Sequence, residues 1–82
     1  MSNEYLKDAI LEAVNNQIES LNPPETKETY DRLLGMGYSD EETKEMIGGV
    51  VSSEIFEVMK KKEPFNKERF VKALNKLPDL PI

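Results

Sequence analysis

Apolar residues recur at helical spacing along one central stretch of the chain, between Asp40 and Lys62. Within that stretch a stripe of apolar side chains occupies positions 46, 47, 50, 51, 55, 58 and 59. Steps of three and four residues are typical of one face of an amphipathic helix. Glu54 is the one charged residue inside the stripe. The pattern predicts a long helix over 40–62, which we expect to be the central and most buried element.

Both ends of this predicted helix carry local signals. Ser39 followed three residues later by Glu42 is the pattern of a capping box, in which each side chain binds the other residue's backbone N–H. Acidic residues at 40–42 and lysines at 60–62 place opposite charges at the two poles of the helix dipole. These signals define the ends of the helix.

The first predicted helix covers about residues 4–21, with Ser2 or Asn3 as its N-cap. The sequence Asn22-Pro23-Pro24 stops it, because proline disfavours the helical conformation in the residue before it. Its inward face is expected to be a stripe of mainly apolar residues, namely Leu6, Ala9, Ile10, Ala13, Val14, Gln17, Ile18 and Leu21.

Two shorter helices are predicted at about 24–34 and 67–76. The former begins with a proline, which is well tolerated in a first turn, and ends before Gly35 and Gly37. The latter follows Asn66 as N-cap, with Phe65 before the cap as a hydrophobic staple. Their inward residues are expected to be Tyr30, Leu33 and Leu34 in the former and Phe70, Val71, Leu74 and Leu77 in the latter.

The chain contains no strand-like alternation, so the expected fold is all-α. We predict one compact four-helix domain over residues 1–82, with a long central third helix and an irregular C-terminal tail at 77–82. Leu80 and Ile82 are apolar for a free tail, and we expect the tail to lie on the surface or to pair with another segment.

The amino-acid composition excludes several kinds of active site and metal site. Cysteine and histidine are both absent from the 82 residues, which removes the usual nucleophile–base pairs and nearly all transition-metal sites. We therefore predict no catalytic residues, no cofactor and no metal. No apolar run approaches the ~20 residues of a membrane span, and the N-terminus lacks the basic and apolar regions of a secretion signal. A cytoplasmic protein that does not bind membranes is expected.

Charge is unevenly distributed along the chain. The net charge of −5 argues against non-specific nucleic-acid binding. Residues 1–59 carry four Lys/Arg and thirteen Asp/Glu, whereas residues 60–76 carry seven Lys/Arg and two Glu. Association of the acidic face of one copy with the basic end of another is therefore one possibility, and it would weaken in salt.

Gly48 and Gly49 interrupt the central helix, where each glycine costs roughly 1 kcal/mol relative to alanine. The favoured interpretation is the close approach of another helix, the first helix at Ala9 and Ala13. A kink that divides the central helix near residue 48 is the second interpretation. A ligand lying against bare backbone is the third.

Glu54 needs a partner if it is buried, because burying a lone charge is costly. It is interpreted as a structural anchor or as a residue at the edge of the stripe that reaches solvent. A functional carboxylate in an enzyme or metal site and a polar pair at a dimer seam are the alternatives. The candidate partners are Arg32, Lys7 and the hydroxyl groups of Tyr5, Tyr30 and Tyr38.

Met36-Gly37-Tyr38-Ser39, followed by Glu41-Glu42, resembles the Met-Gly-Phe/Tyr loop of ubiquitin-associated domains. The resemblance covers about residues 25–59 at most. It implies ubiquitin binding, with Met36, Gly37 and Tyr38 as the contact residues. Such domains have two short helices after the loop, whereas here the apolar stripe continues to Met59.

A longer resemblance covers roughly residues 22–77. The pattern of Asn22-Pro23-Pro24-Glu25, Gly37-Tyr38-Ser39 and Phe70-x-x-x-Leu74-x-x-Leu77 resembles a family of short, uncharacterised bacterial all-helical proteins, a domain-of-unknown-function family. The resemblance implies an all-helical fold and a bacterial cytoplasmic location, and it implies no activity. Relatives often have histidines near the third helix, and this chain has none.

The leading functional hypothesis is a non-enzymatic interaction or regulatory module that binds a protein partner or forms a homodimer. It rests on the apolar residues left over by a small domain without a catalytic constellation. Those residues are Leu11, Phe56, Leu80 and Ile82.

Overall fold

The computed structural model describes residues 4–80, and this part of the chain contains four helices and no strand. The helices are α1 (Glu4–Ser20), α2 (Pro24–Gly35), α3 (Asp40–Lys61) and α4 (Lys67–Lys76). The predicted all-α four-helix fold with a long third helix is confirmed, and each helix end lies within one residue of its expected position. The expected caps Ser2 and Asn3, and Ile82 of the tail, lie outside the described residues.

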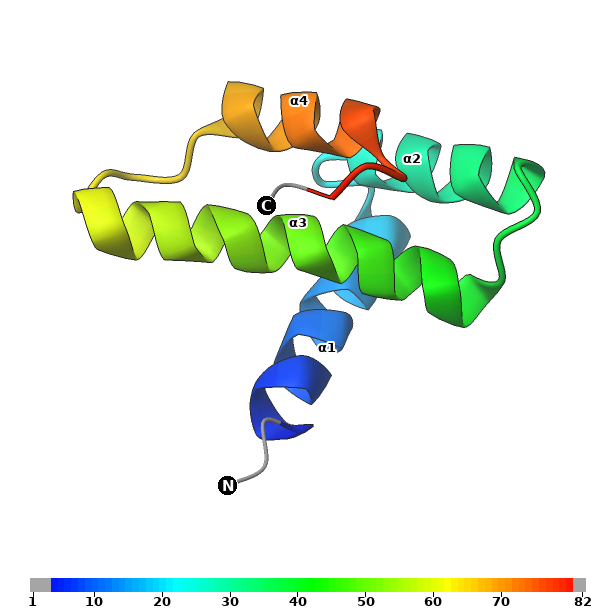
Figure 1. Cartoon of the computed structure of the whole chain (residues 1–82), viewed down its shortest axis with the longest axis horizontal. Helices are drawn as coiled ribbons and strands as arrows, with labels where there is room; N and C mark the ends of the chain where they lie inside the picture. The colour runs from blue at the N-terminus through cyan, green and yellow to red at the C-terminus, as the bar shows by residue number, and fades with distance from the viewer. Residues whose placement is uncertain (1–3, 81–82) are drawn as a thin grey trace.

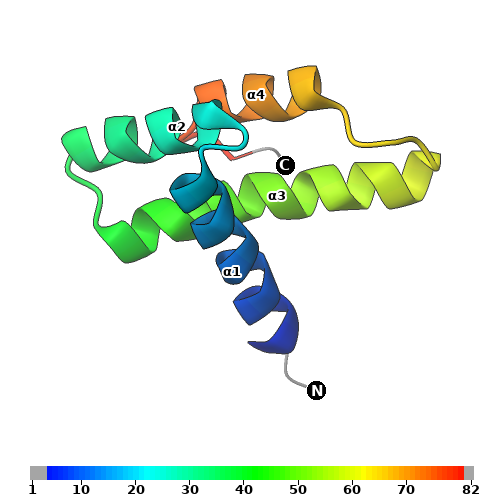
Figure 2. The same ribbon diagram turned by 180° about the vertical axis from the view of Figure 1, so that it is seen from behind.

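The helices are arranged around α3, which runs along the length of the molecule (Figure 1). Helices α2 and α4 lie on one side of α3, and α1 crosses α3 near its middle. The first half of α1 then projects beyond α3 on the side opposite α2 and α4, as the reverse view also shows (Figure 2). The core therefore lies between α3, α2, α4 and the second half of α1.

The ends of α3 follow the signals in the sequence. The Ser39 hydroxyl accepts a hydrogen bond from the Glu42 backbone N–H at 3.1 Å, and the Glu42 carboxylate accepts one from the Ser39 N–H at 2.9 Å. The predicted capping box is thus confirmed. At the other end Lys62 adopts the left-handed conformation, with φ of 54°, which terminates the helix.

The core is small and includes threonines. Its buried apolar residues are Val14, Leu33, Ile47, Val50, Val51, Phe70, Leu74 and Leu77. In α2 the buried residues are Thr26, Thr29 and Leu33. Tyr30 is half-buried and packs against the core, whereas Leu34 is exposed, so the expected α2 face was confirmed at Tyr30 and Leu33 and wrong at Leu34. The Thr26 hydroxyl donates a hydrogen bond to the Gln17 side chain of α1 at 2.9 Å, which meets the cost of burying it.

Helix α3 has two apolar faces, and the predicted stripe combined parts of both. The buried residues are Thr43, Ile47, Gly48, Val50, Val51 and Glu54. Ile55 and Met59, which were expected in the core, are 46% and 72% exposed. The step from Val51 to the next buried position is three residues, and it falls on Glu54. A carboxylate therefore stands where the core stripe continues, and Ile55 faces outward.

Helix α1 is buried along its second half only. Val14 is fully buried, and Ile10 and Ile18 pack against the core. By contrast, Leu6 is 62% exposed and Leu21 is 55% exposed, so the expected inward face was wrong at both ends of the stripe. The described side chains from residue 5 to residue 9 are all exposed. This part of α1 is the segment that projects beyond α3.

Candidate functional site

A groove of about 290 Å³ lies between the projecting half of α1 and α3. Its lining residues are Leu6, Lys7, Ile10, Leu11, Glu45, Gly48, Gly49 and Ser52, and we call it the α1–α3 groove. Most of the lining is apolar side chain or bare glycine backbone. An ion pair between Lys7 and Glu45, 3.0 Å apart, links the two helices at its edge. Its hydrogen bond and the negative charge of Glu45 raise the pKa of Lys7 above the ordinary value.

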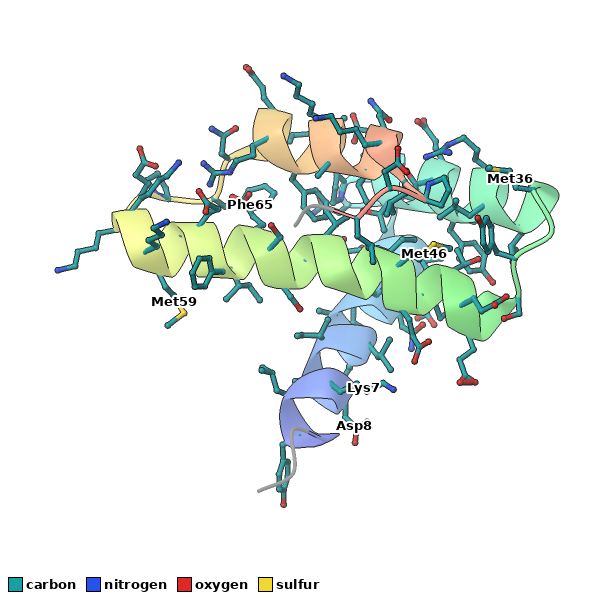
Figure 3. The ribbon with its side chains drawn as sticks, in the orientation of Figure 1. Lys7, Asp8, Met36, Met46, Met59 and Phe65 are labelled. Carbon is teal, nitrogen blue, oxygen red and sulfur yellow. The ribbon has the colours of Figure 1, made fainter. Side chains whose placement is uncertain are left out.

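The wall that α3 contributes to this groove continues toward the C-terminal end of the helix. Positions 45, 48, 49, 52, 55, 56 and 59 follow one another in steps of one and three residues, so they form one face, which we call the outer face of α3. Phe56 is 61% exposed and Met59 is 72% exposed on this face. Figure 3 shows Met59 on the side of α3 from which α1 projects. The groove and this face are thus continuous.

Gly48 permits the close approach of α1. A Cβ atom added at Gly48 would lie 3.2 Å from Cγ2 of Ile10, closer than an ordinary van der Waals contact. The expected approach of the first helix is confirmed, although it occurs at Ile10 rather than at Ala9 and Ala13. Helix α3 continues unbroken through this position.

Gly49 faces a different segment. A Cβ atom added there would lie 3.1 Å from Cδ2 of Leu80, so the C-terminal segment lies against α3 where the side chain is missing. The expectation that the tail lies on the surface is confirmed as far as Leu80. Leu80 also lines a second hollow with Tyr38, Glu42, Glu45 and Met46.

Glu54 is buried and fully paired. One carboxylate oxygen accepts a hydrogen bond from Nε of Arg69, and the other accepts one from Nη2, both at 2.8 Å. The second oxygen also accepts the Asn66 backbone N–H at 2.9 Å. Asn66 is the N-cap of α4, and its side chain accepts the Arg69 backbone N–H at 3.0 Å. Glu54 therefore fixes the start of α4 against α3.

The expected partners of Glu54 were wrong. Lys7 pairs with Glu45, and the Tyr30 hydroxyl donates to Asp40 at 2.6 Å. The Arg32 guanidinium donates to the carbonyl oxygens of Leu74 and Leu77, at 3.0 and 2.8 Å. One feature of the sequence could have identified Arg69 as the partner. It is a cation in the first turn of the fourth helix, and the turn at 62–66 folds that helix back against α3.

Glu54 is consequently a structural anchor rather than an open carboxylate. Both of its oxygens are occupied by groups of the protein itself. Within residues 4–80 no group of three acidic residues is placed so that it could hold a metal ion. The arrangement holds α3 and α4 together and leaves the carboxylate no free oxygen for a substrate.

Acidification should weaken the fold through this anchor. The hydrogen bonds from Arg69, with help from the Asn66 N–H and against the effect of burial, hold the pKa of Glu54 below its ordinary value of 4.5. A lowered folded-state pKa adds stability above pH 4.5, and that stability is lost as the pH falls through the folded-state value. Urea denaturation at several pH values should show this loss, and Glu54→Gln should show a smaller one. Equal acid sensitivity of the two proteins would contradict the assignment.

The Met36-Gly37-Tyr38 loop lies at the turn between α2 and α3, at one end of the molecule (Figure 3). Met36 is 54% exposed, whereas Tyr38 is half-buried and packs against the core. Gly37 has a φ of 101°, a conformation that glycine adopts readily. The loop is not part of the α1–α3 groove, and Glu54 lies against α4, so the residues singled out in the sequence fall into three separate regions.

The C-terminal end of α3 is basic. Nζ of Lys60 lies 5.8 Å from the centroid of the Phe56 ring, within the range of a cation–π contact. Lys61 forms an ion pair with Glu57 at 2.9 Å, which contributes to lowering the pKa of that carboxylate. Positive charge therefore borders the exposed end of the outer face.

Comparison of the chain with protein-family models, with curated proteins and with solved structures finds no match. Among the helices of residues 4–80, none has the length and apolar character that crossing a membrane requires.

Proposed function

We propose that this chain is a non-enzymatic protein–protein interaction module that binds an amphipathic helix in the α1–α3 groove and along the outer face of α3. The observation that carries the proposal is the continuity of the groove with Ile55, Phe56 and Met59, which are 46%, 61% and 72% exposed. Contiguous apolar surface that a small domain leaves uncovered is characteristic of interaction sites.

The projecting half of α1 supports the same interpretation. Two turns of helix gain little stability on their own, since isolated helices shorter than about 12 residues are marginal in water. Tyr5 is 93% exposed and Leu6 is 62% exposed on this segment. Apolar side chains on a projecting helix are best explained by a partner that covers them.

The groove also specifies the chemistry of its occupant. Ile10 and Leu80 of the same chain already lie against Gly48 and Gly49, so an occupant would find its main contacts at the exposed side chains of the groove and the outer face. Phe56 offers an exposed aromatic side chain of the type enriched at binding hot spots. Because Lys60 borders this aromatic, the best-fitting occupant is a helix with one apolar side and carboxylates beside it.

A crosslinking experiment tests the proposal. The chain has no cysteine, so Ser52→Cys in the groove provides a single attachment point for a photoreactive group. Irradiation in cells of the source organism should give one protein adduct, identified by mass spectrometry. The matched control is Lys72→Cys on the exposed side of α4, which should give none. Absence of a specific adduct at Ser52, or the same adducts from both variants, would overturn the proposal.

A further inference from the structure

We propose that the occupant of the α1–α3 groove is the first half of α1 from a second copy of this chain, so that two copies exchange these segments around a two-fold axis. This inference rests on the proposed function, because it names the partner of the same groove. Three observations support it. They are the acidic, amphipathic character of α1, the lysines at the end of the outer face of α3, and the position of α1 next to that face.

Helix α1 has the side chains that the groove requires. Tyr5, Leu6 and Ala9 lie on one side of its projecting half, and all three are exposed. Asp8 and Glu12, which are exposed one turn apart, lie beside this apolar side. The 17 residues of α1 contain four carboxylates and one lysine. It is thus an acidic amphipathic helix whose apolar residues are incompletely covered by its own chain.

The end of α3 carries the complementary charge. Lys60 and Lys62 are both exposed at the C-terminal end of α3, and Nζ of Lys60 lies 5.8 Å from the centroid of the Phe56 ring on the outer face. An acidic helix laid along this face would place its carboxylates near these lysines. Two copies of α1 repel each other, and so do two copies of the lysine end, so α1 of one copy against the lysine end of its partner is the electrostatically favoured pairing.

A two-fold axis makes the two α1–groove contacts of such a dimer equivalent. The projecting half of α1 contributes part of the groove lining in each copy. A two-fold axis can therefore place each α1 in the partner's groove at the same time, which gives a closed interface. Residues 4–12 span about 12 Å of helix, and the face from Gly48 to Met59 spans about 16 Å.

A stable dimer would bury a substantial share of the surface of this chain. A specific interface buries about 800 Å² on each partner, or about one seventh of the 5746 Å² of accessible surface on this chain. The projecting half of α1, the groove and the outer face of α3 adjoin one another, and all three would take part in such an interface.

Two charge-reversed variants test the exchange. The first carries Asp8→Lys and Glu12→Lys, and the second carries Lys60→Glu and Lys62→Glu. In each variant alone the segments that meet have like charges, so dimerisation should weaken by more than about tenfold. In an equimolar mixture both contacts again join opposite charges, because the two-fold axis pairs α1 of each variant with α3 of the other. Light scattering and analytical ultracentrifugation should therefore show a dimer for the native chain, monomers for each variant, and a heterodimer for the mixture.

A matched control separates this effect from net charge. Glu19→Lys with Glu28→Lys makes the same charge change as the first variant at exposed positions away from the groove, and this variant should remain dimeric. Circular dichroism should show native helicity for all variants, since every changed side chain is exposed. A native chain that is monomeric over about a hundredfold range of concentration, or variants that dimerise alone, would overturn the exchange. If the Ser52 adduct then contains a different protein, the proposed function survives; if there is no adduct, both fail.

Discussion

Replacing Glu54 with alanine should lower the free energy of unfolding by about 2–4 kcal/mol. The substitution leaves the Arg69 guanidinium and the Asn66 N–H without the carboxylate that binds both. Removing one partner of a buried ion pair typically costs about 3–5 kcal/mol, and the lower range applies because the Arg69 side chain is 30% exposed. For a domain of this size the melting temperature should fall by about 10–25 °C.

Glu57→Ala is the matched control for this result. Glu57 lies one turn further along α3 and pairs with Lys61 within the same helix. Surface pairs of this kind contribute only about 0.3–0.5 kcal/mol, so the melting temperature should change little. Thermal denaturation followed by circular dichroism measures both variants. A melting temperature of Glu54→Ala within error of the native value would show that the anchor does not stabilise the fold.

Gly48→Leu should destabilise the domain by about 1–3 kcal/mol, the usual cost of overpacking. Leucine is a far better helix former than glycine, so any loss must come from steric conflict rather than from helix propensity. The conflict is with Ile10, whose Cγ2 atom would lie 3.2 Å from the first added carbon. Ile10 cannot move away freely because it packs against the core.

Gly49→Ala should have the opposite sign and stabilise the domain by up to about 1 kcal/mol. Its new methyl group would meet Leu80, which is 48% exposed and close to the end of the chain. That side chain can shift by the few tenths of an ångström required. Urea denaturation measures the change in the free energy of unfolding for Gly48→Leu and for Gly49→Ala. Stabilisation by Gly48→Leu would mean that α1 does not approach α3 at this position.

Local signals predicted the helices well because they depend on neighbouring residues. The capping box of Ser39 and Glu42 and the cap at Asn66 both involve residues three apart. The staple is similar, with the rings of Phe65 and Phe70 5.5 Å apart. These contacts join residues only three to five positions apart, so the sequence alone contains the information that defines them.

The orientation of α3 was harder to predict because apolar residues occupy both of its faces. Periodicity identifies a helix, but it cannot decide whether Ile55 or Glu54 faces the core when both fit the spacing. Glu54 faces inward because Arg69 and Asn66 meet its charge there. Those partners are 15 and 12 residues away in the sequence, and only the folded path of the chain brings them near.

The candidate site was predicted in part. Gly48 and Phe56 were singled out from the sequence, and both belong to the groove or to the outer face beside it. The contribution of Leu6 was missed, because its place in the α1 stripe predicted burial in the core. What the sequence did not contain was the angle between α1 and α3, which carries the first turns of α1 beyond its own core.

The projection of α1 has a consequence for how the protein fluctuates. Residues 5–9 of α1 and the last turns of α3 are the parts of the two helices that the core holds least. Segments with few buried contacts are the first to open in local unfolding, and here they are also the segments that form the proposed binding surface. Binding must therefore order turns of α1 and α3 that the core holds only weakly. Part of the interaction free energy is lost in that ordering. The protection of the backbone amides in these turns would then report whether the groove is occupied.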